Sequence, residues 1–186
     1  MNQLTARDLR LAIIAALAQR LTGGMGRTAL MKLVYFLQTL KDLPLGYSFR
    51  LYTYGPFEPQ VLEDLKVAEM MGAVRSTVFS YPGGYGYEIR SGEHADRVAG
   101  RARDELAAYE RALDWVVEEF GSRSAIDLEM ASTIVYVDRA SAAKEAQLST
   151  VEIAARVEEV KPRLQRALIQ AEAQKLKDNG LLIATV

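Results

Sequence analysis

The pattern of apolar and polar positions predicts two helices in the first forty residues. Apolar side chains recur at helical spacing between residues 13 and 21 and again between residues 30 and 37. Thr5, followed three residues later by Asp8, resembles a capping box at the start of the first helix, which we expect to end near Thr22. The second helix is apolar nearly all round, which is typical of a helix in the centre of a core.

A period of two replaces the helical period between residues 47 and 54, where YSFRLYTY predicts a strand of about eight residues. We expect Gly55-Pro56 to end this strand and to open a helix, because proline suits the first helical turn. Gly72 is a natural left-handed stop for that helix. The apolar face of the helix is predicted at Val61, Leu62, Leu65 and Ala68, with Glu63, Asp64 and Glu69 turned away from the core.

Two β-type segments follow, AVRSTVF and YGYEIR, joined by a turn at residues 80–84. Proline and glycine in that turn predict a β-hairpin. Together with the strand at residues 47–54, the hairpin would give a three-stranded sheet packed on helices. We therefore predict an α+β fold whose residues 1–92 form a winged-helix-like unit, with the hairpin as the wing.

The remainder, residues 93–186, is predicted to be a helical unit that either packs on the first or belongs to one domain with it. One long helix is expected to end at Gly121 and another to cover residues 124–137. A third begins at Thr150, and Pro162 is expected to open the last helix, which stops at Asn179-Gly180. Residues 181–186 are compatible with a short terminal strand.

Composition limits the chemistry of the chain. It contains no cysteine and one histidine, His94, so disulfides, thiolate metal sites, His-rich metal sites and a Ser-His-Asp triad are not expected. We predict no catalytic, cofactor-binding or metal-binding residues and no enzymatic activity. No apolar run reaches the ~20 residues that span a bilayer, and the first residues do not resemble a signal peptide. A cytoplasmic protein with no membrane partner is expected.

Several motifs resemble those of the SocA-like antitoxin family, also called the Panacea domain, and of its YwgA-like phage-associated relatives. The resemblance covers roughly residues 26–182. It is carried by a Lys-Leu-hydrophobic-Tyr helix, a Tyr-x-Tyr-Gly-Pro-aromatic segment, an acidic Asp-Leu helix and a Gly-hydrophobic step into a hairpin: Lys32, Leu33, Tyr35, Tyr52, Tyr54, Gly55, Pro56, Phe57, Asp64, Leu65, Gly72 and Val74. In the second half, Asp127-Leu128-Glu129 with Ala131, and Lys161-Pro162, also resemble the family.

The resemblance implies a non-catalytic protein that binds a partner protein. Members of the family with an assigned role neutralise a toxin through protein contacts, in one case by delivering it to a protease. A toxin, a protease or both are therefore the expected partners, and a homodimer is compatible with the sequence. No catalytic residue carries over from the family.

Two surfaces are candidates for binding. Exposed aromatic residues suit a protein partner, although aromatic residues in strands also pack across strands; the candidates are Tyr52, Tyr54, Phe57, Tyr81, Tyr85 and Tyr87. The alternative function is that of a winged-helix DNA-binding regulator, with phosphates contacted by Arg27, Lys32, Arg75 and Arg90. Residues 56–72 carry a net charge of −3, which would repel the DNA backbone, and protein binding is therefore favoured.

Overall fold

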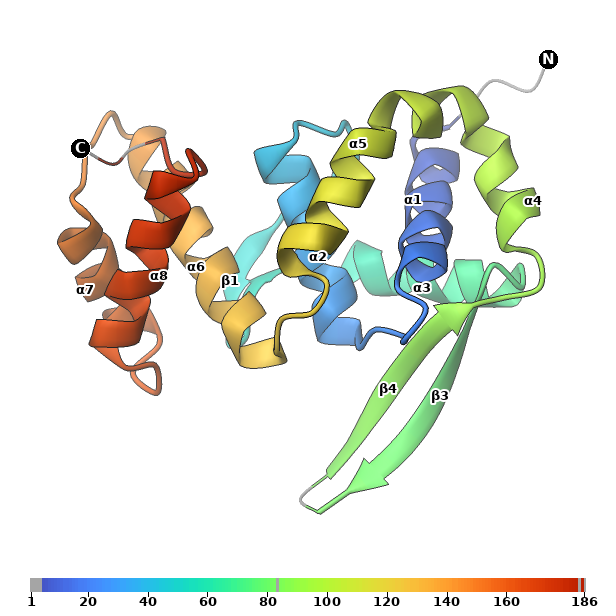
Figure 1. Ribbon diagram of the computed structural model, residues 1–186, viewed down its shortest axis with the longest axis horizontal. Helices are drawn as coiled ribbons and strands as arrows, with labels where there is room; N and C mark the ends of the chain where they lie inside the picture. The colour runs from blue at the N-terminus through green and yellow to red at the C-terminus, as the bar shows by residue number, and fades with distance from the viewer. Residues whose placement is uncertain (1–4, 83, 184, 186) are drawn as a thin grey trace. The chain divides into compact units, whose positions relative to one another are not determined.

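The computed structural model describes residues 5–82, 84–183 and 185, and it is an α+β protein made of helices and two small antiparallel sheets. The chain forms two compact units. The first contains the residues up to Ser48 together with Glu58–Arg123, and the second contains Phe49–Phe57 together with the residues from Ser124 onward. Figure 1 shows the path of the chain.

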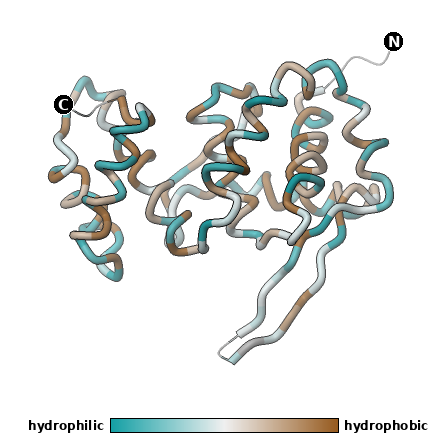
Figure 2. Tube along the Cα trace, viewed as in Figure 1, coloured by the Kyte–Doolittle hydropathy of each residue, from teal (hydrophilic) through white to brown (hydrophobic). Residues whose placement is uncertain are grey.

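The first unit begins with the two predicted helices, α1 (Ala6–Arg20) and α2 (Arg27–Leu40). The capping box is confirmed, since the Thr5 hydroxyl accepts from the Asp8 N–H and the Asp8 carboxylate accepts from the Thr5 N–H. Both helices lie in the core of the unit and are buried over most of their length, as expected from their many apolar residues, which are brown in Figure 2. The prediction of a central α2 is thereby confirmed.

Helix α3 (Pro59–Met70) starts three residues later than predicted. Pro59, and not Pro56, takes the first helical position, and the Glu58 carboxylate caps the helix by accepting from the Gln60 N–H at 3.0 Å. Pro56 instead lies buried in a strand, where its fixed φ is equally acceptable. The left-handed stop is confirmed at Gly72, which has a φ of 70°.

The hairpin is confirmed as β3 (Val74–Tyr81) and β4 (Gly84–Ser91), which pair antiparallel. Its third partner differs from the prediction: an isolated bridge joins Ile89 of β4 to Met25, which precedes α2. The residues expected to form the third strand belong to a separate two-stranded sheet. The order α1, Met25, α2, α3, β3, β4 makes the first unit winged-helix-like.

The long helix expected before Gly121 is divided into α4 (Ala95–Ala99), a short 3₁₀ turn (Gly100–Ala102) and α5 (Arg103–Phe120). All three pack on α1, and α5 also packs on α2, where the Phe120 and Phe36 rings stack with centroids 4.0 Å apart. These contacts explain why the first unit extends to Arg123, whereas the boundary was expected after residue 92.

The second unit contains β1 (Arg50–Tyr52), β2 (Gly55–Phe57), α6 (Ala125–Ala142), α7 (Thr150–Val160) and α8 (Arg166–Asp178). The eight-residue strand is reduced to β1 because Gly55, with a φ of 84°, lets the chain fold back so that β2 pairs with β1. Helix α6 packs on β2.

Pro162 does not open the last helix. Lys161, which precedes it, has a φ of −135°, as expected of a residue before proline, and α8 begins four residues after the proline. The helix still ends at the predicted Asn179-Gly180, where Gly180 is left-handed. Near the terminus, the described Thr185 forms one parallel bridge with Leu148.

Candidate protein-binding surface

The β3–β4 hairpin is an arm that extends away from the helices of the first unit (Figure 1). Its base is anchored by Val74 and Ile89, which are buried, and by the Met25 bridge, whose two N···O distances are 2.9 and 2.7 Å. Beyond this base, residues 76–87 carry no charged side chain, and the arm is pale or brown in Figure 2. The charges resume only at Arg75 and Glu88.

One face of the arm carries apolar and aromatic side chains that extend from the buried base into solvent. Because residues paired across strands share a face, Val78 lies beside Tyr87 and Ser80 beside Tyr85. We call these four residues the arm face. The side chains of Val78 and Tyr85 are 62% and 64% exposed, and the Tyr85 and Tyr87 rings meet edge to face at 5.9 Å. The arm face is therefore an apolar and aromatic surface outside the core.

On the opposite face of the arm, Gly86 lies across from Phe79. A Cβ at Gly86 would come within 2.5 Å of the Phe79 ring, so the ring covers the backbone of the residue that faces it. Such an aromatic-glycine pair helps to fix the register of the two strands. Phe79 was not among the site residues predicted from the sequence. Tyr81 ends β3, but its side chain lies outside the part of the chain that the structure describes.

The structure brings two of the four basic candidates together, since Arg75 and Arg90 lie opposite each other across β3 and β4. The Lys32 side chain lies in the core, 2% exposed. The Arg27 guanidinium stacks on the Tyr87 ring at 3.4 Å, and Arg90 donates to Glu88 at 2.8 Å and to the Thr22 carbonyl at 2.9 Å. Arg75 is exposed. The guanidinium of Arg27 thus packs against Tyr87 of the arm face, apart from Arg75 and Arg90.

Tyr52, Tyr54 and Phe57 belong to the second unit, on its β1–β2 hairpin. The side chains of Tyr52 and Tyr54 are 68% and 59% exposed, and Phe57 is half-buried. The sequence-predicted aromatic set is thus divided between the two units.

Lys161 fixes the turn that carries these tyrosines. Its ammonium donates to the carbonyls of Tyr52 and Thr53, both at 2.5 Å, although its side chain is almost fully buried. The buried Glu129 carboxylate lies 3.6 Å from the same ammonium and accepts from Arg163, whose guanidinium stacks on Tyr54 at 4.8 Å. Burial lowers the pKa of Lys161, and the charge of Glu129 opposes that effect.

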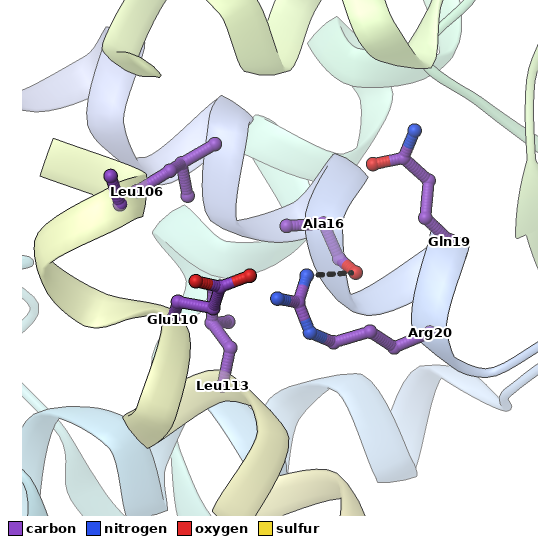
Figure 3. A pocket seen from close by; sticks show the side chains of 7 residues that line it. Ala16, Gln19, Arg20, Leu106, Glu110 and Leu113 are labelled. Atoms are coloured by element: carbon purple, nitrogen blue, oxygen red, sulfur yellow. Dashed lines mark hydrogen bonds between the residues drawn. The ribbon is translucent and has the colours of Figure 1, made fainter. Parts of the chain in front are cut away.

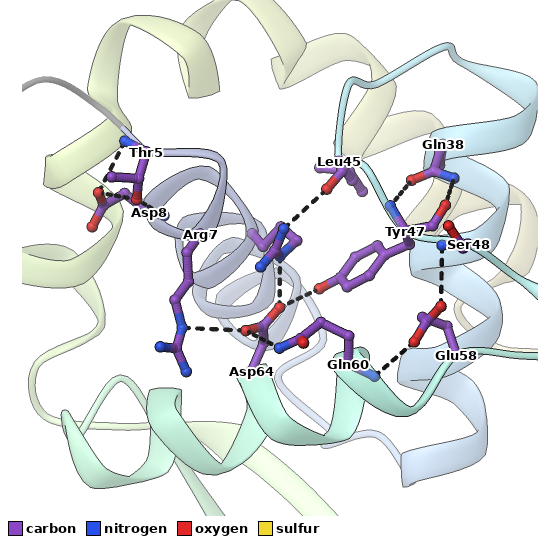
Figure 4. Close-up of polar contacts among 11 residues, drawn as sticks. Thr5, Arg7, Asp8, Gln38, Leu45, Tyr47, Ser48, Glu58, Gln60 and Asp64 are labelled. Carbon is purple, nitrogen blue, oxygen red and sulfur yellow. Dashed lines mark hydrogen bonds and ion pairs between the residues drawn. The ribbon is translucent and has the colours of Figure 1, made fainter.

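A second buried carboxylate organises the first unit (Figure 4). Asp64 was expected to turn away from the core, but it is fully buried and accepts from Arg10 at 2.7 Å, Tyr47 at 3.0 Å and Gln60 at 3.1 Å. Arg7 lies 3.4 Å from the same carboxylate. The network joins α1, α3 and the loop before residue 48. Helical periodicity could not reveal it, because Arg10 lies 54 residues away in the sequence.

Burial and the neighbouring Asp64 carboxylate raise the pKa of Tyr47 well above its usual value of about 10. The unfolded chain therefore releases this proton first as the pH rises. We expect the free energy of unfolding to fall by up to about 1.4 kcal/mol per pH unit above about pH 10 through this residue alone. Urea unfolding at several pH values, with Tyr47→Phe as the comparison, measures the difference. Equal slopes for the two proteins would contradict the prediction.

A shallow pocket of about 200 Å³ lies between α1 and α5 (Figure 3). Its polar groups are the Arg20 guanidinium, the Gln19 amide and the Glu110 carboxylate. Arg20 donates to Asp114 at 2.7 Å and to the Ala16 carbonyl at 3.4 Å. The pocket is lined by Ala16, Gln19, Arg20, Leu106, Ala107, Glu110 and Leu113.

Within residues 5–82, 84–183 and 185, no three acidic or histidine side chains are grouped so that they could hold a metal ion. Across the same described residues, no helix combines the length and the apolar character needed to cross a membrane. His94, the single histidine, is exposed at the start of α4.

In comparisons with known proteins, no family model and no curated protein matches the chain. The resemblance to the SocA-like family therefore rests on the sequence motifs given above. Three of the motif residues, Asp64, Lys161 and Glu129, lie in the two buried polar networks.

Proposed function

We propose that the chain is a non-catalytic protein-binding module of the antitoxin or proteolytic-adaptor type, and that it docks its partner on the arm face. The observation that carries the proposal is an exposed aromatic and aliphatic surface on an arm whose residues 76–87 hold no charge. Tyrosine is enriched at the centre of protein interfaces and charged residues are depleted there. The family resemblance supports the same function.

One aromatic side chain of the arm face, that of Tyr87, is already ordered without a partner. Tyr87 is held between the Tyr85 ring and the Arg27 guanidinium, so its position is fixed before a partner arrives. Binding then costs less side-chain entropy than it would for free aromatic side chains. A partner with an apolar surface that accepts hydrogen bonds from the tyrosine hydroxyls fits this face best.

DNA binding is the alternative function, and the winged-helix-like order of elements favours it. The charges oppose it. Lys66, the one basic residue of α3, pairs with Glu63 at 2.8 Å, so the exposed surface of α3 offers no free cation. Of the four basic candidates, Arg75 alone is exposed and makes no hydrogen bond or ion pair with the described residues.

The experiment captures partner proteins from the native host on the tagged chain and identifies them. The identified partner is then purified, and its binding to the chain is measured. We expect Tyr85→Ala with Tyr87→Ala to weaken binding by at least about 30-fold, because the loss of even one central aromatic residue costs about 2 kcal/mol. Leu168→Ser, which alters an exposed residue of α8 in the second unit, is the matched control and should bind normally. Capture of nucleic acid alone, lost in Arg75→Ala with Arg90→Ala, would replace the proposal by the DNA-binding alternative.

A further inference from the structure

The outer edge of β3 is an unpaired strand edge. Within the described residues, β3 pairs only with β4, and the exposed part of β3 runs from Thr77 to Ser80. Natural edge strands are usually protected by charges, bulges or proline within the strand. The exposed residues of β3 have none of these features, so this edge is open to another strand.

The Met25 bridge shows which backbone groups face that edge. Ile89 exchanges both of its backbone hydrogen bonds with Met25, so its N–H and C=O point away from β3. Its cross-strand partner Ser76 must then point its own backbone groups away from β4, since antiparallel pairs alternate between bonded and non-bonded. By the same alternation, the N–H and C=O of Val78 and Ser80 also face the open edge.

These groups fit a second copy of the same strand. In a two-fold antiparallel pair centred on Val78, Val78 faces Val78 of the second copy and Ser76 faces Ser80 of the second copy. The Val78–Val78 pair and the two Ser76–Ser80 pairs are of the bonded type, which gives about six hydrogen bonds between the two strands. Thr77 faces Phe79 and Arg75 faces Tyr81, so no like charges are placed opposite each other.

We propose that two copies of the chain pair through the β3 edge, centred on Val78, to form a four-stranded antiparallel sheet. A two-stranded arm is marginally stable in water, and the second copy supplies the strands that it lacks. The two arm faces then become one surface, on which Val78 of each copy lies between the two Tyr87 residues. This proposal does not rest on the proposed function, since it concerns the strand edge and not the partner protein.

The test uses the full-length chain and measures its mass in solution over a concentration series by sedimentation velocity. We expect twice the monomer mass of 20.6 kDa for the wild type. Val78→Glu places two like charges opposite each other at the two-fold axis and should give a monomer, as should Val78→Lys. Mixing the two variants should restore the dimer. Val78→Thr, which keeps the strand and adds no charge, should remain dimeric.

Val78 is exposed, so these substitutions leave the core of the first unit intact, and circular dichroism checks that each variant is folded. A monomeric wild type would overturn the proposal, and so would a dimer that persists in Val78→Glu. Failure of the mixed variants to associate would overturn the register centred on Val78. Each result is independent of whether Tyr85 and Tyr87 bind a partner protein.

Discussion

Asp64→Ala is expected to lower the free energy of unfolding by about 3 to 5 kcal/mol. The substitution removes the acceptor of Arg10, Tyr47 and Gln60 at once, and it leaves the largely buried Arg10 guanidinium without its carboxylate. Breaking a buried ion pair from one side costs this much because the remaining charge stays desolvated. For a chain of this length, the corresponding fall in Tm is about 6 to 20 °C.

Chemical denaturation of the purified variant measures the effect. Asp64→Asn keeps an acceptor for Tyr47 and should fall between the wild type and Asp64→Ala. Glu63→Ala, at the exposed neighbouring position, is the control and should change stability by less than about 0.5 kcal/mol. A loss in Asp64→Ala no larger than that of the control would show that the network contributes little.

Glu129→Met is expected to destabilise the second unit by about 3 kcal/mol or more. Glu129 is the carboxylate that compensates the buried Lys161 ammonium and that also accepts from Arg163. Without it, Lys161 is a buried cation held only by the carbonyls of Tyr52 and Thr53. The β1–β2 turn should loosen, since those carbonyls are its anchor.

The double variant, Glu129→Met with Lys161→Met, separates the charge from the packing. Replacing both members of a buried ion pair by apolar residues is often close to neutral, so the double variant should be more stable than Glu129→Met. Glu158→Met, at a partly exposed position of α7, is the control. If the double variant is the least stable of the three in denaturant unfolding, the explanation by charge compensation is wrong.

Local signals in the sequence were sufficient for much of the fold. The capping box at Thr5, the core helix α2, the left-handed Gly72 and the β3–β4 hairpin each depend on residues within a few positions of one another. Such features follow from backbone conformation and side-chain periodicity, which a single sequence displays directly.

The predictions that were wrong depend on contacts between residues that lie far apart in the sequence. Pro56 and Pro162 were both expected to open helices, but proline is equally compatible with a strand or a turn, and long-range packing decides between them. Asp64 was predicted to turn away from the core, whereas it is buried and accepts a hydrogen bond from Arg10. For the candidate site, the aromatic residues of the arm were found, whereas Val78 and the stacking of Arg27 on Tyr87 required the strand register.

The assignment of Phe49–Phe57 to the second unit has a consequence for biosynthesis. Lys161, which holds the turn of this segment, is 109 residues further along the chain than Tyr52. At about 5 to 20 residues per second, the ribosome needs about 5 to 20 s to make the intervening chain. During that time the first unit can fold, while the contacts that Phe49–Phe57 makes in the second unit cannot yet form. The second unit is therefore expected to fold last. Because it is discontinuous in sequence, a fragment that begins after Arg123 would lack Phe49–Phe57.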